Sequence, residues 1–352
     1  MKSYALVGFG QPLQEIESAD PVPQGTEVLI KVRRCGVCHS DIHISEGYFD
    51  FGDGQKFRMT DRGMELPTTL GHEVLGEVIA AGPDAEEAPI GKTMLVHPWI
   101  GCGTCRACRE ERENDCATMK PIGVLRDGGY ATHVIVPDPK FLVDVEGIDP
   151  TIVTPYACSG VTVYTALKKA LPVEDDEWLC IMGAGGLGLT AVSIAKAMGA
   201  DQIVSVDIDD EKLAVARDMG ATEVLNPKTC EDPVATLTEM TGGMLLAAVD
   251  TVGSEQTSRL GILSLRKTGR YVVVGLYGGA LKIPMPILPL KALTVRGSYV
   301  GSCRDLRELI ELVKAGKVKP IPVATRPLDQ ADVTLRDLAA GKIVGRVVLT
   351  TD

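Results

Sequence analysis

The sequence predicts an α/β protein in two parts, a β-rich part followed by a doubly wound parallel sheet with helices on both faces. Up to about residue 150, short β-branched runs are broken by glycine and proline, which is typical of a barrel-like or sandwich β domain with long loops. From about residue 160, apolar runs alternate with helical segments, which indicates βαβ units around a buried parallel sheet. The length of 352 residues is enough for two domains with separate cores.

Individual elements follow from the same patterns. In the first part, strands are predicted at 27–34, 74–82, 93–99 and 130–137. In the second part, strands are predicted at 178–182, 203–208, 223–226, 246–252 and 270–276, and helices at 189–199 and 210–220. A helix at 305–317 and a strand at 345–351 end the chain. We expect a first domain over 1–159, with 300–352 packing back onto it, and a second domain over 160–299.

Composition excludes several classes of function. The net charge of −11 disfavours nucleic acid and anionic membranes as partners, because both would repel the chain. No apolar run approaches the ~20 residues that a membrane helix needs, and the N-terminus lacks the pattern of a signal peptide. Ten cysteines without an export signal indicate metal ligands or buried thiols in a reducing cytoplasm rather than disulfides. We therefore expect a cytoplasmic protein that acts on a small molecule.

A glycine-rich segment, GAGGLG at 183–188, predicts a dinucleotide site. Gly183, Gly185 and Gly188 fit the pattern G-x-G-x-x-G between a strand and a helix, and Asp207 ends the next strand 19 residues after Gly188. The glycines allow close approach of the pyrophosphate, and the helix N-terminus stabilises its charge. The Asp207 carboxylate would accept hydrogen bonds from the ribose hydroxyls and repel a 2′-phosphate, which favours NAD(H) over NADP(H). Lys212, one helical turn later, is a candidate to help hold the ribose.

Four closely spaced cysteines predict a structural zinc site. They follow the pattern C-x2-C-x2-C-x7-C, with the members Cys102, Cys105, Cys108 and Cys116. Four thiolates at this density suit a closed tetrahedral zinc ion that holds a loop. An iron–sulfur cluster is the alternative, but the bacterial ferredoxin pattern has three residues before its fourth cysteine and a proline after it, whereas here Ala117 follows.

A second metal site is indicated by residues far apart in the chain. The segment CGVCH at 35–39 matches the attachment pattern of a c-type haem, and its C-x-x-C unit matches a redox dithiol. The cytoplasmic location disfavours haem. Cys38, His72 and Cys158, with Glu73 beside His72, supply two thiolates and an imidazole, which together with an open position make a catalytic zinc site. Cys35, Cys180, Cys230 and Cys303 remain as structural thiols of unassigned role.

Taken in order, GVCHSD, GHEVLG, the four-cysteine segment, GAGGLG with Asp207 and the terminal GRVVL resemble the zinc-dependent alcohol dehydrogenases of the medium-chain dehydrogenase/reductase superfamily. The resemblance covers essentially the whole chain. It implies a GroES-like catalytic domain, an inserted Rossmann domain and an active site in the cleft between them. It also implies two zinc ions per chain, NAD(H) and a homo-oligomer, a tetramer or otherwise a dimer.

The resemblance assigns roles by position. Cys38, His72 and Cys158 correspond to the catalytic zinc ligands, Glu73 to the nearby carboxylate that can join them, and Asp41 to the partner that orients His72. Ser40 and His43 correspond to the start and end of a proton relay. Thr162 and Leu187 correspond to positions lining the nicotinamide, Gly186 belongs to the glycine-rich segment, and Arg346 corresponds to a contact of the pyrophosphate. His39 corresponds to a second phosphate contact; the alternative is a surface histidine.

The segment between Asp41 and His72 is longer than in the common family pattern and rich in aromatic residues. Tyr48, Phe49, Phe51 and Phe57 lie there, in a chain with only five phenylalanines, and Trp99 precedes the four-cysteine segment. We expect these residues to form a pocket wall or lid; the alternative is an oligomer contact or a surface loop. The aromatic residues favour apolar, aromatic, secondary or cyclic alcohols as substrates.

Two alternative functions follow from the same residues. A polyol dehydrogenase or aldehyde reductase of the same superfamily is the nearer one, although Cys158 favours an alcohol dehydrogenase because many polyol enzymes have glutamate there. A zinc-binding or redox-sensing protein without enzymatic activity is the more remote one. It would lack ligand or relay residues, and this sequence has all of them.

Overall fold

A six-stranded parallel sheet organises the second half of the computed structural model, which describes residues 1–351. The strand order is β13-β12-β11-β14-β15-β16. The chain therefore begins with β11 in the middle, adds β12 and β13 on one side, and then adds β14, β15 and β16 on the other. This is the order of a Rossmann sheet, and the predicted doubly wound fold is confirmed. The strands are β11 (Trp178–Met182), β12 (Ile203–Val206), β13 (Glu223–Leu225), β14 (Leu245–Asp250), β15 (Arg270–Val273) and β16 (Thr294–Gly297).

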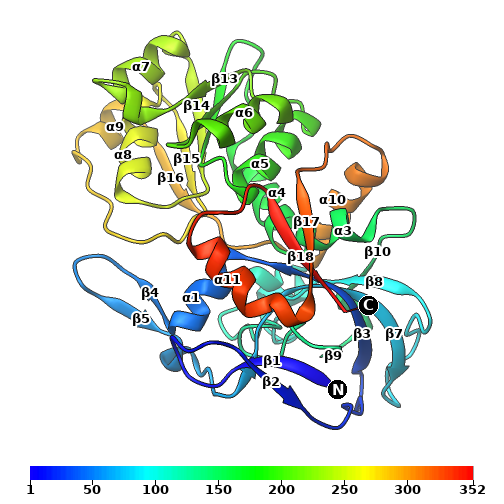
Figure 1. Ribbon diagram of the computed structural model, residues 1–352. Helices are drawn as coiled ribbons and strands as arrows, with labels where there is room; N and C mark the ends of the chain where they lie inside the picture. The colour runs from blue at the N-terminus through cyan, green and yellow to red at the C-terminus, as the bar shows by residue number, and fades with distance from the viewer. Residues whose placement is uncertain (352) are drawn as a thin grey trace.

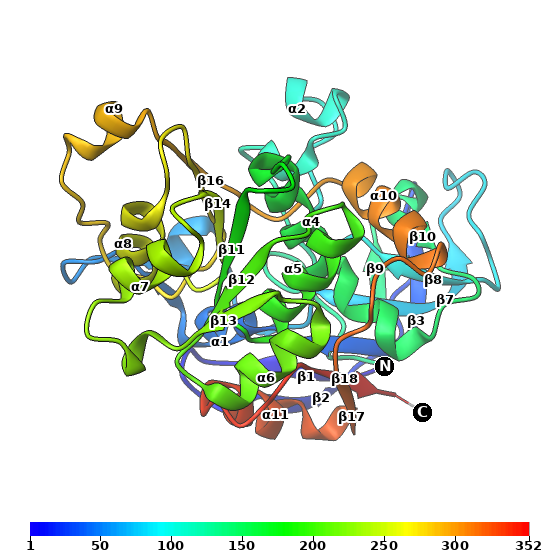
Figure 2. The same cartoon turned by 90° about the horizontal axis from the view of Figure 1, so that it is seen from above.

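Helices cover both faces of this sheet (Figures 1 and 2). In β11, Leu179 and Ile181 enter the core shared with α4 and α5, whereas Cys180 and Met182 enter the core shared with α7 and α8. Both sets are buried, which is why the strand reads as a continuous apolar run. The helices of this half are α4 (Ser159–Ala170), α5 (Gly186–Ala197), α6 (Asp210–Met219), α7 (Pro233–Met240), α8 (Glu255–Ser264) and α9 (Ile287–Lys291).

The first half is built on a larger, mostly antiparallel sheet in the order β10-β8-β7-β3-β18-β17, with β9 also paired to β3. A separate small sheet has the order β2-β1-β6, and β4 and β5 form a hairpin. The strands are β1 (Lys2–Leu6), β2 (Gln14–Glu17), β3 (Val28–Val37), β4 (Tyr48–Asp50), β5 (Lys56–Arg58), β6 (Thr68–Thr69), β7 (Glu73–Ala81), β8 (Thr93–Val96), β9 (His133–Val136) and β10 (Leu142–Asp144).

Short helices connect these strands. The α-helices of the first half are α1 (His39–Glu46), α2 (Arg106–Arg109) and α3 (Pro150–Val153). The 3-10 turns of the first half are Thr60–Arg62, Glu113–Asp115, Pro139–Phe141 and Thr154–Ala157. Two further 3-10 turns, Pro227–Thr229 and Leu328–Gln330, lie in the parallel-sheet half and in the C-terminal segment. Within residues 1–351, no helix is both long and apolar enough to cross a bilayer.

The C-terminal segment returns to the first half (Figure 1). It consists of α10 (Cys303–Lys314), β17 (Val323–Pro327), α11 (Ala331–Ala339) and β18 (Arg346–Thr350). β18 pairs antiparallel with β3 in the register Val347↔Val37, and parallel with β17. The ends of the described chain therefore lie in the same half, while the parallel sheet is built from residues between them. The predicted domain limits at 159/160 and 299/300 remain predictions.

A buried histidine joins the two halves where the chain leaves the parallel sheet. His97, just after β8, is fully buried, and its Nε2 lies 3.0 Å from the carbonyl oxygen of Gly301. A Cβ atom at Gly301 would lie 2.4 Å from Oγ1 of Thr165 in α4, so this segment has no room for a side chain. Burial lowers the pKa of His97 to about 4, and the histidine is neutral in the folded protein near pH 7.

This pKa predicts an acid-dependent loss of stability. Below its ordinary pKa of about 6.5, the histidine of the unfolded chain binds a proton that folded His97 does not bind until about pH 4. The free energy of unfolding should therefore fall as pH falls from about 6.5 to 4, by roughly 3 kcal/mol from this residue. We expect urea unfolding of His97→Gln to show a flatter pH dependence over this range than the wild type. The same pH dependence of the free energy of unfolding in both proteins would contradict a contribution from His97.

Candidate active site

Strand register brings four potential metal ligands together. Gly36 in β3 pairs with Glu73 at the start of β7, so Cys38, after β3, and His72, before β7, meet at one end of the sheet. Cys158 joins them from the turn that precedes α4. The ligand atoms of Cys38, His72, Glu73 and Cys158 all lie within 4.8 Å of one another, and all four residues are buried.

The geometry of this group fits a zinc ion. The Sγ atoms of Cys38 and Cys158 are 3.9 Å apart; two sulfurs bound at about 2.3 Å to one tetrahedral zinc would be roughly 3.8 Å apart. Among the described residues, His72 Nε2 is buried without a hydrogen-bond partner, whereas Nδ1 is held 3.0 Å from Oδ1 of Asp41. The ring thus presents Nε2 to the two sulfurs, as a ligating histidine with a supporting carboxylate does.

The charges around this group are strongly coupled. The contact with Cys158 lowers the pKa of Cys38 well below its usual value and raises that of Cys158. One thiolate is therefore already favoured, and a bound cation would favour loss of the second proton. Burial raises the pKa of Glu73 to about 7, against the effect of its ion-pair partner Arg346. Arg346 is itself buried, and this ion pair joins the start of β7 to the start of β18.

Helix α1 carries the residues predicted for proton transfer. Asp41 is fully buried and accepts hydrogen bonds from the Cys38 amide at 3.0 Å and the Tyr130 hydroxyl at 2.9 Å, in addition to that from His72. Ser40 lies in the first turn of the helix, beside Cys38. His43 lies one turn later, and burial lowers its pKa from the usual value. Ser40 and His43 are both partly buried, and Glu46 lies exposed at the helix end.

His39 lies at the surface of the same helix. It is exposed, and its ring contacts that of His43 edge to face at a centroid distance of 5.4 Å. The neighbouring positive charge that His39 would carry when protonated adds to burial in lowering the pKa of His43. The predicted phosphate contact of His39 stays a prediction.

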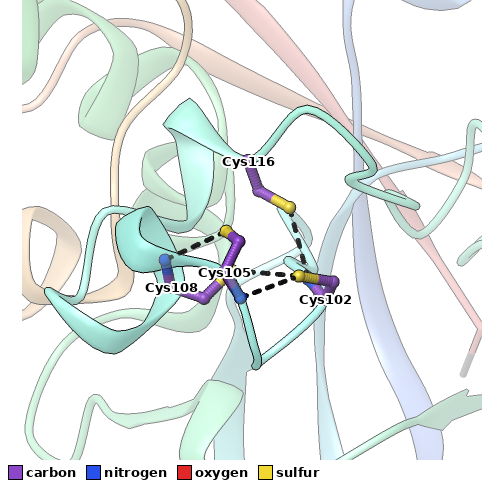
Figure 3. A group of neighbouring side chains, drawn as sticks. All are labelled: Cys102, Cys105, Cys108 and Cys116. Atoms are coloured by element: carbon purple, nitrogen blue, oxygen red, sulfur yellow. Dashed lines mark hydrogen bonds between the residues drawn. The ribbon is translucent and has the colours of Figure 1, made fainter.

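The four-cysteine segment forms a separate lobe around α2 (Figures 2 and 3). Its four ligand atoms lie within 4.8 Å of one another, and the Sγ atoms of Cys102 and Cys108 are 4.0 Å apart, again a separation suited to tetrahedral zinc. Backbone amides donate to the sulfurs; the Cys105 amide lies 3.3 Å from Sγ of Cys102. Hydrogen bonds from Thr104 and nearby amides lower the pKa of Cys102 to about 5, which favours the thiolate that a zinc ion requires.

The glycine-rich loop has the close backbone packing that a dinucleotide site requires. A Cβ atom at Gly188 would lie 1.8 Å from the carbonyl oxygen of Gly183. Gly183 has a φ of 93°, in the left-handed region that favours glycine. A Cβ atom at Gly186 would lie 2.5 Å from Cδ of Arg346, so this arginine packs between the loop and Glu73. Helix α5 begins after Gly185, whose lack of a side chain leaves the helix N-terminus uncapped and open to an anionic group.

Asp207 lies beside this loop. Its Oδ2 accepts a hydrogen bond from the Ala184 amide at 2.6 Å, which fixes the carboxylate at the end of β12. Lys212 points to a different carboxylate, with its Nζ 3.5 Å from Oδ2 of Asp209. On the other side of the site, Thr162 in α4 is bonded through its amide to Cys158, and Leu187 is partly buried in the same core.

The predicted pocket residues fall into two groups. Trp99 lies against His72, with ring centroids 5.5 Å apart, and against Tyr299, 6.1 Å away. The hairpin residues lie elsewhere: Phe51 and Phe57 stack at 5.0 Å. Phe49 contacts His43 at 5.4 Å, and Lys56 covers the ring of Tyr48. Of the hairpin aromatics, Phe49 therefore lies beside His43, whereas Trp99 lies beside His72, one of the potential metal ligands.

Between the hairpin and the dinucleotide half lies a cavity of about 420 Å³. Its walls include His43 and Tyr48 on one side and Tyr277 and Lys282 on the other. The two sides touch through their backbones: a Cβ atom at Gly52 would lie 2.7 Å from the carbonyl carbon of Gly279. The cavity therefore lies beyond His43, at the outer end of α1.

Two residues of the site were not predicted from the sequence. Tyr299 follows the last parallel strand, and its position at the carboxyl end of β16, where ligands of such sheets bind, was an available signal. Tyr130 reaches Asp41 from the loop before β9, and nothing in the local sequence indicates that contact.

The chain is similar to known dehydrogenases both in sequence and in structure. Residues 24–147 match the alcohol dehydrogenase GroES-like domain and residues 186–315 match the zinc-binding dehydrogenase domain. An NAD-dependent alcohol dehydrogenase of Sulfurisphaera tokodaii is 38% identical over 99% of each chain. The crystal structure of an alcohol dehydrogenase from Aeropyrum pernix superposes with a TM-score of 0.90 at 30% identity, over 99% of this chain and 100% of the other. The structure of an acetophenone reductase from Geotrichum candidum in complex with NAD superposes with a TM-score of 0.84 at 30% identity, over 99% of this chain and 96% of the other.

Proposed function

Because the chain belongs to the family of zinc-dependent alcohol dehydrogenases, we propose that it oxidises an alcohol to an aldehyde or ketone with NAD⁺, and catalyses the reverse reaction. The observation that carries the proposal is the buried group of Cys38, His72 and Cys158, in which an imidazole nitrogen without a partner faces two sulfurs. Arg346, the ion-pair partner of Glu73, also packs against Gly186 and so links this group to the glycine-rich loop.

Cys38, His72 and Cys158 would hold the catalytic zinc ion, with Glu73 close enough to join them. Zinc supplies a Lewis acid that withdraws electron density from the alcohol oxygen, and NAD⁺ supplies the acceptor of the hydride. Ser40 takes the hydroxyl proton and passes it outward. His43 receives it, since its lowered pKa keeps the imidazole neutral and able to act as a base near pH 7. Asp41 holds His72 in the tautomer that presents Nε2.

The remaining assignments concern binding. Asp207 would bind the ribose hydroxyls with help from Lys212, and Gly183, Gly185, Gly186 and Gly188 would accommodate the pyrophosphate together with Arg346 and His39. Thr162 and Leu187 would contact the nicotinamide. Cys102, Cys105, Cys108 and Cys116 would hold a structural zinc ion that stabilises a lobe with little apolar core of its own.

For the substrate, we propose an alcohol with an apolar, aromatic or cyclic body, secondary alcohols included. Trp99 and Tyr299 supply an aromatic wall beside His72, and an acetophenone reductase is among the similar structures. Tyr48, Phe49, Phe51 and Phe57 would line the outer part of the path to the site, at the cavity beside His43. A polyol dehydrogenase or aldehyde reductase of the same superfamily is the alternative.

The experiment that tests this proposal combines metal analysis with kinetics. We expect two zinc ions per chain, NAD-linked oxidation of benzylic, cyclic and secondary alcohols with higher kcat/KM than ethanol or propanol, and weak activity with NADP⁺. Polyols as best substrates would favour the alternative. Two zinc ions without activity on any alcohol, polyol or aldehyde would favour a binding protein.

Variants at the site sharpen the same test. We expect Cys38→Ala to lose the catalytic zinc and turnover while NAD⁺ binding, measured by fluorescence titration, remains. Ser40→Ala should keep both zinc ions and lower kcat by about 100-fold or more, because it removes one positioned proton acceptor. Near-normal turnover of Ser40→Ala with full zinc content would contradict the relay.

Asp207 should determine the choice of cofactor. Removing its carboxylate in Asp207→Ser removes the repulsion of a 2′-phosphate and the acceptor of the ribose hydroxyls. We expect the ratio of kcat/KM for NADP⁺ to that for NAD⁺ to rise about 10-fold or more, since one charged hydrogen bond contributes roughly 1.5–3 kcal/mol. Asp218→Ser, at an exposed position in the last turn of α6, is the matched control and should leave the ratio unchanged.

We further propose a cytoplasmic homo-oligomer, a tetramer or otherwise a dimer, in which two chains meet along β16. This strand ends the parallel sheet, all its residues are exposed, and Met285 and Leu290 just before it are 70% and 74% exposed. An unpaired edge beside exposed apolar side chains is suited to pairing with a second copy. Because the net charge is −11, nucleic acid and anionic membranes are not proposed as partners.

A charge on this edge should weaken the assembly. Val295, in β16, is 39% exposed, and Ile79, in β7 of the other half, is 37% exposed. In sedimentation equilibrium we expect the wild type and Ile79→Lys to have the same oligomeric mass and Val295→Lys a smaller one. A wild type of 37.5 kDa, or equal masses for all three proteins, would contradict association through β16.

A further inference from the structure

The carboxylate of Asp41 connects the two chain segments that carry Cys38 and His72. Its Oδ1 is 3.0 Å from Nδ1 of His72, and its Oδ2 accepts the Cys38 amide at 3.0 Å. As the third residue of α1, Asp41 thereby also completes a cap of the helix that Cys38 begins. The position of this one side chain therefore affects two potential zinc ligands at once.

Tyr130 supplies the third hydrogen bond to this carboxylate. Its hydroxyl lies 2.9 Å from Oδ2 of Asp41, the oxygen that also accepts the Cys38 amide. Tyr130 is fully buried and belongs to a cluster of apolar side chains in the first half of the protein. A phenylalanine would fill the same space, and a buried hydroxyl is unfavourable unless it is hydrogen-bonded. The hydroxyl thus has its partner in the side chain that orients His72.

The backbone around Tyr130 fixes its position relative to His72. The Tyr130 amide donates to the carbonyl of Leu70 at 3.0 Å, and the Gly129 amide donates to Gly71 at 2.7 Å. The ring packs directly on Gly71: a Cβ atom there would lie 2.5 Å from Cδ1 of Tyr130. Gly71 also has a φ of 92°, which favours glycine. The residue immediately before His72 is therefore held by the same tyrosine whose hydroxyl binds Asp41.

We propose that Tyr130 is a positioning residue of the catalytic metal site, which holds the Asp41 carboxylate in place and through it both His72 and Cys38. The inference rests on the proposed zinc-dependent function. Without the hydroxyl, Asp41 keeps two of its three hydrogen bonds and is freer to rotate, and the His72 ring loses orientation. The metal should therefore leave the site faster, because partners of metal ligands affect metal affinity by about 10–100-fold.

The test compares two matched variants of the full chain. Tyr130→Phe removes the hydroxyl that binds Asp41. Tyr4→Phe removes a partly buried hydroxyl that donates to Glu15 at 2.7 Å, from a residue whose amide pairs with the Tyr130 carbonyl. Zinc release to a chromogenic chelator is followed for both, and the catalytic phase is identified as the one missing in His72→Ala. The phase from the four-cysteine site serves as the internal reference.

We expect Tyr130→Phe to release the catalytic zinc about 10-fold faster, with the structural zinc unchanged, and Tyr4→Phe to match the wild type in both phases. With cobalt in the catalytic site, the visible spectrum should shift in Tyr130→Phe only. In an Asp41→Asn background, Tyr130→Phe should have less than about a 2-fold further effect, because it acts through Asp41.

Other outcomes separate this inference from the proposed function. A wild type that binds two zinc ions and oxidises alcohols, with equal catalytic zinc release from Tyr130→Phe and Tyr4→Phe, would overturn the inference alone. A wild type that binds no zinc at Cys38, His72 and Cys158 would overturn the proposed function. If Tyr130→Phe does not fold, 3-fluorotyrosine at position 130 keeps the hydroxyl but makes it a stronger donor. An unchanged release rate and cobalt spectrum would then contradict the inference.

Discussion

The register of β3 with its two neighbours is the constraint on which the site depends. Gly36 pairs with Glu73 on one side, and Val37 pairs with Val347 on the other. The end of β3 therefore meets the start of β7 and the start of β18, which brings Cys38, His72 and Arg346 to one place. Gly36 leaves the space for this: a Cβ atom there would lie 1.9 Å from Oε2 of Glu73. A slip by one residue would reverse the faces of these strands and separate the group.

Several polar atoms around this point are buried without partners among the described residues. They are His72 Nε2, Glu73 Oε2, Trp99 Nε1, Thr162 Oγ1 and Arg346 Nε. An unsatisfied buried polar group costs about 1–3 kcal/mol, so a folded protein rarely collects several in one place. The concentration here is understandable if ligands complete the site. A metal ion at the sulfurs would give His72 Nε2 a partner and lies within reach of Glu73.

The two halves of the protein are connected more closely than two linked domains need to be. The largest apolar cluster contains Trp99 and Cys158 together with Leu179 and Ile181 of the parallel sheet, and α4 runs through it. His97 and Gly301 add a hydrogen bond at the same junction. At the outer edge, Gly52 of the hairpin meets Gly279 of the dinucleotide half. The potential metal ligands, the predicted relay residues and the glycine-rich loop thus belong to one continuous structure, which suits a reaction that requires their mutual placement.

Much of the fold was predictable because it is encoded locally. The strand at 178–182 has the predicted bounds, and the β12 and α6 segments differ from prediction by one or two residues at their ends. Continuous apolar runs, a helix period and glycine at the turns carry that information within a few residues. Among the described helices, only α5, α6 and α10 were predicted; α4, α7, α8, α11 and the short helices α1, α2, α3 and α9 were not. α4 is buried on nearly all sides and so lacks the polar stripe that makes a helix recognisable, and its limits are set by packing between the two halves.

The sequence by itself determined the family, the parallel sheet, the two groups of potential metal ligands and the glycine-rich loop, because residue type and spacing carry that chemistry. Only the tertiary structure decided how the distant members meet. Trp99 lies against His72 and Tyr299, whereas Phe49 of the hairpin lies against His43. Arg346 pairs with Glu73 and also packs on Gly186. The contact of Tyr130 with Asp41 spans 89 residues. Such contacts depend on strand register and on side-chain packing between distant segments, which no local pattern of residues records.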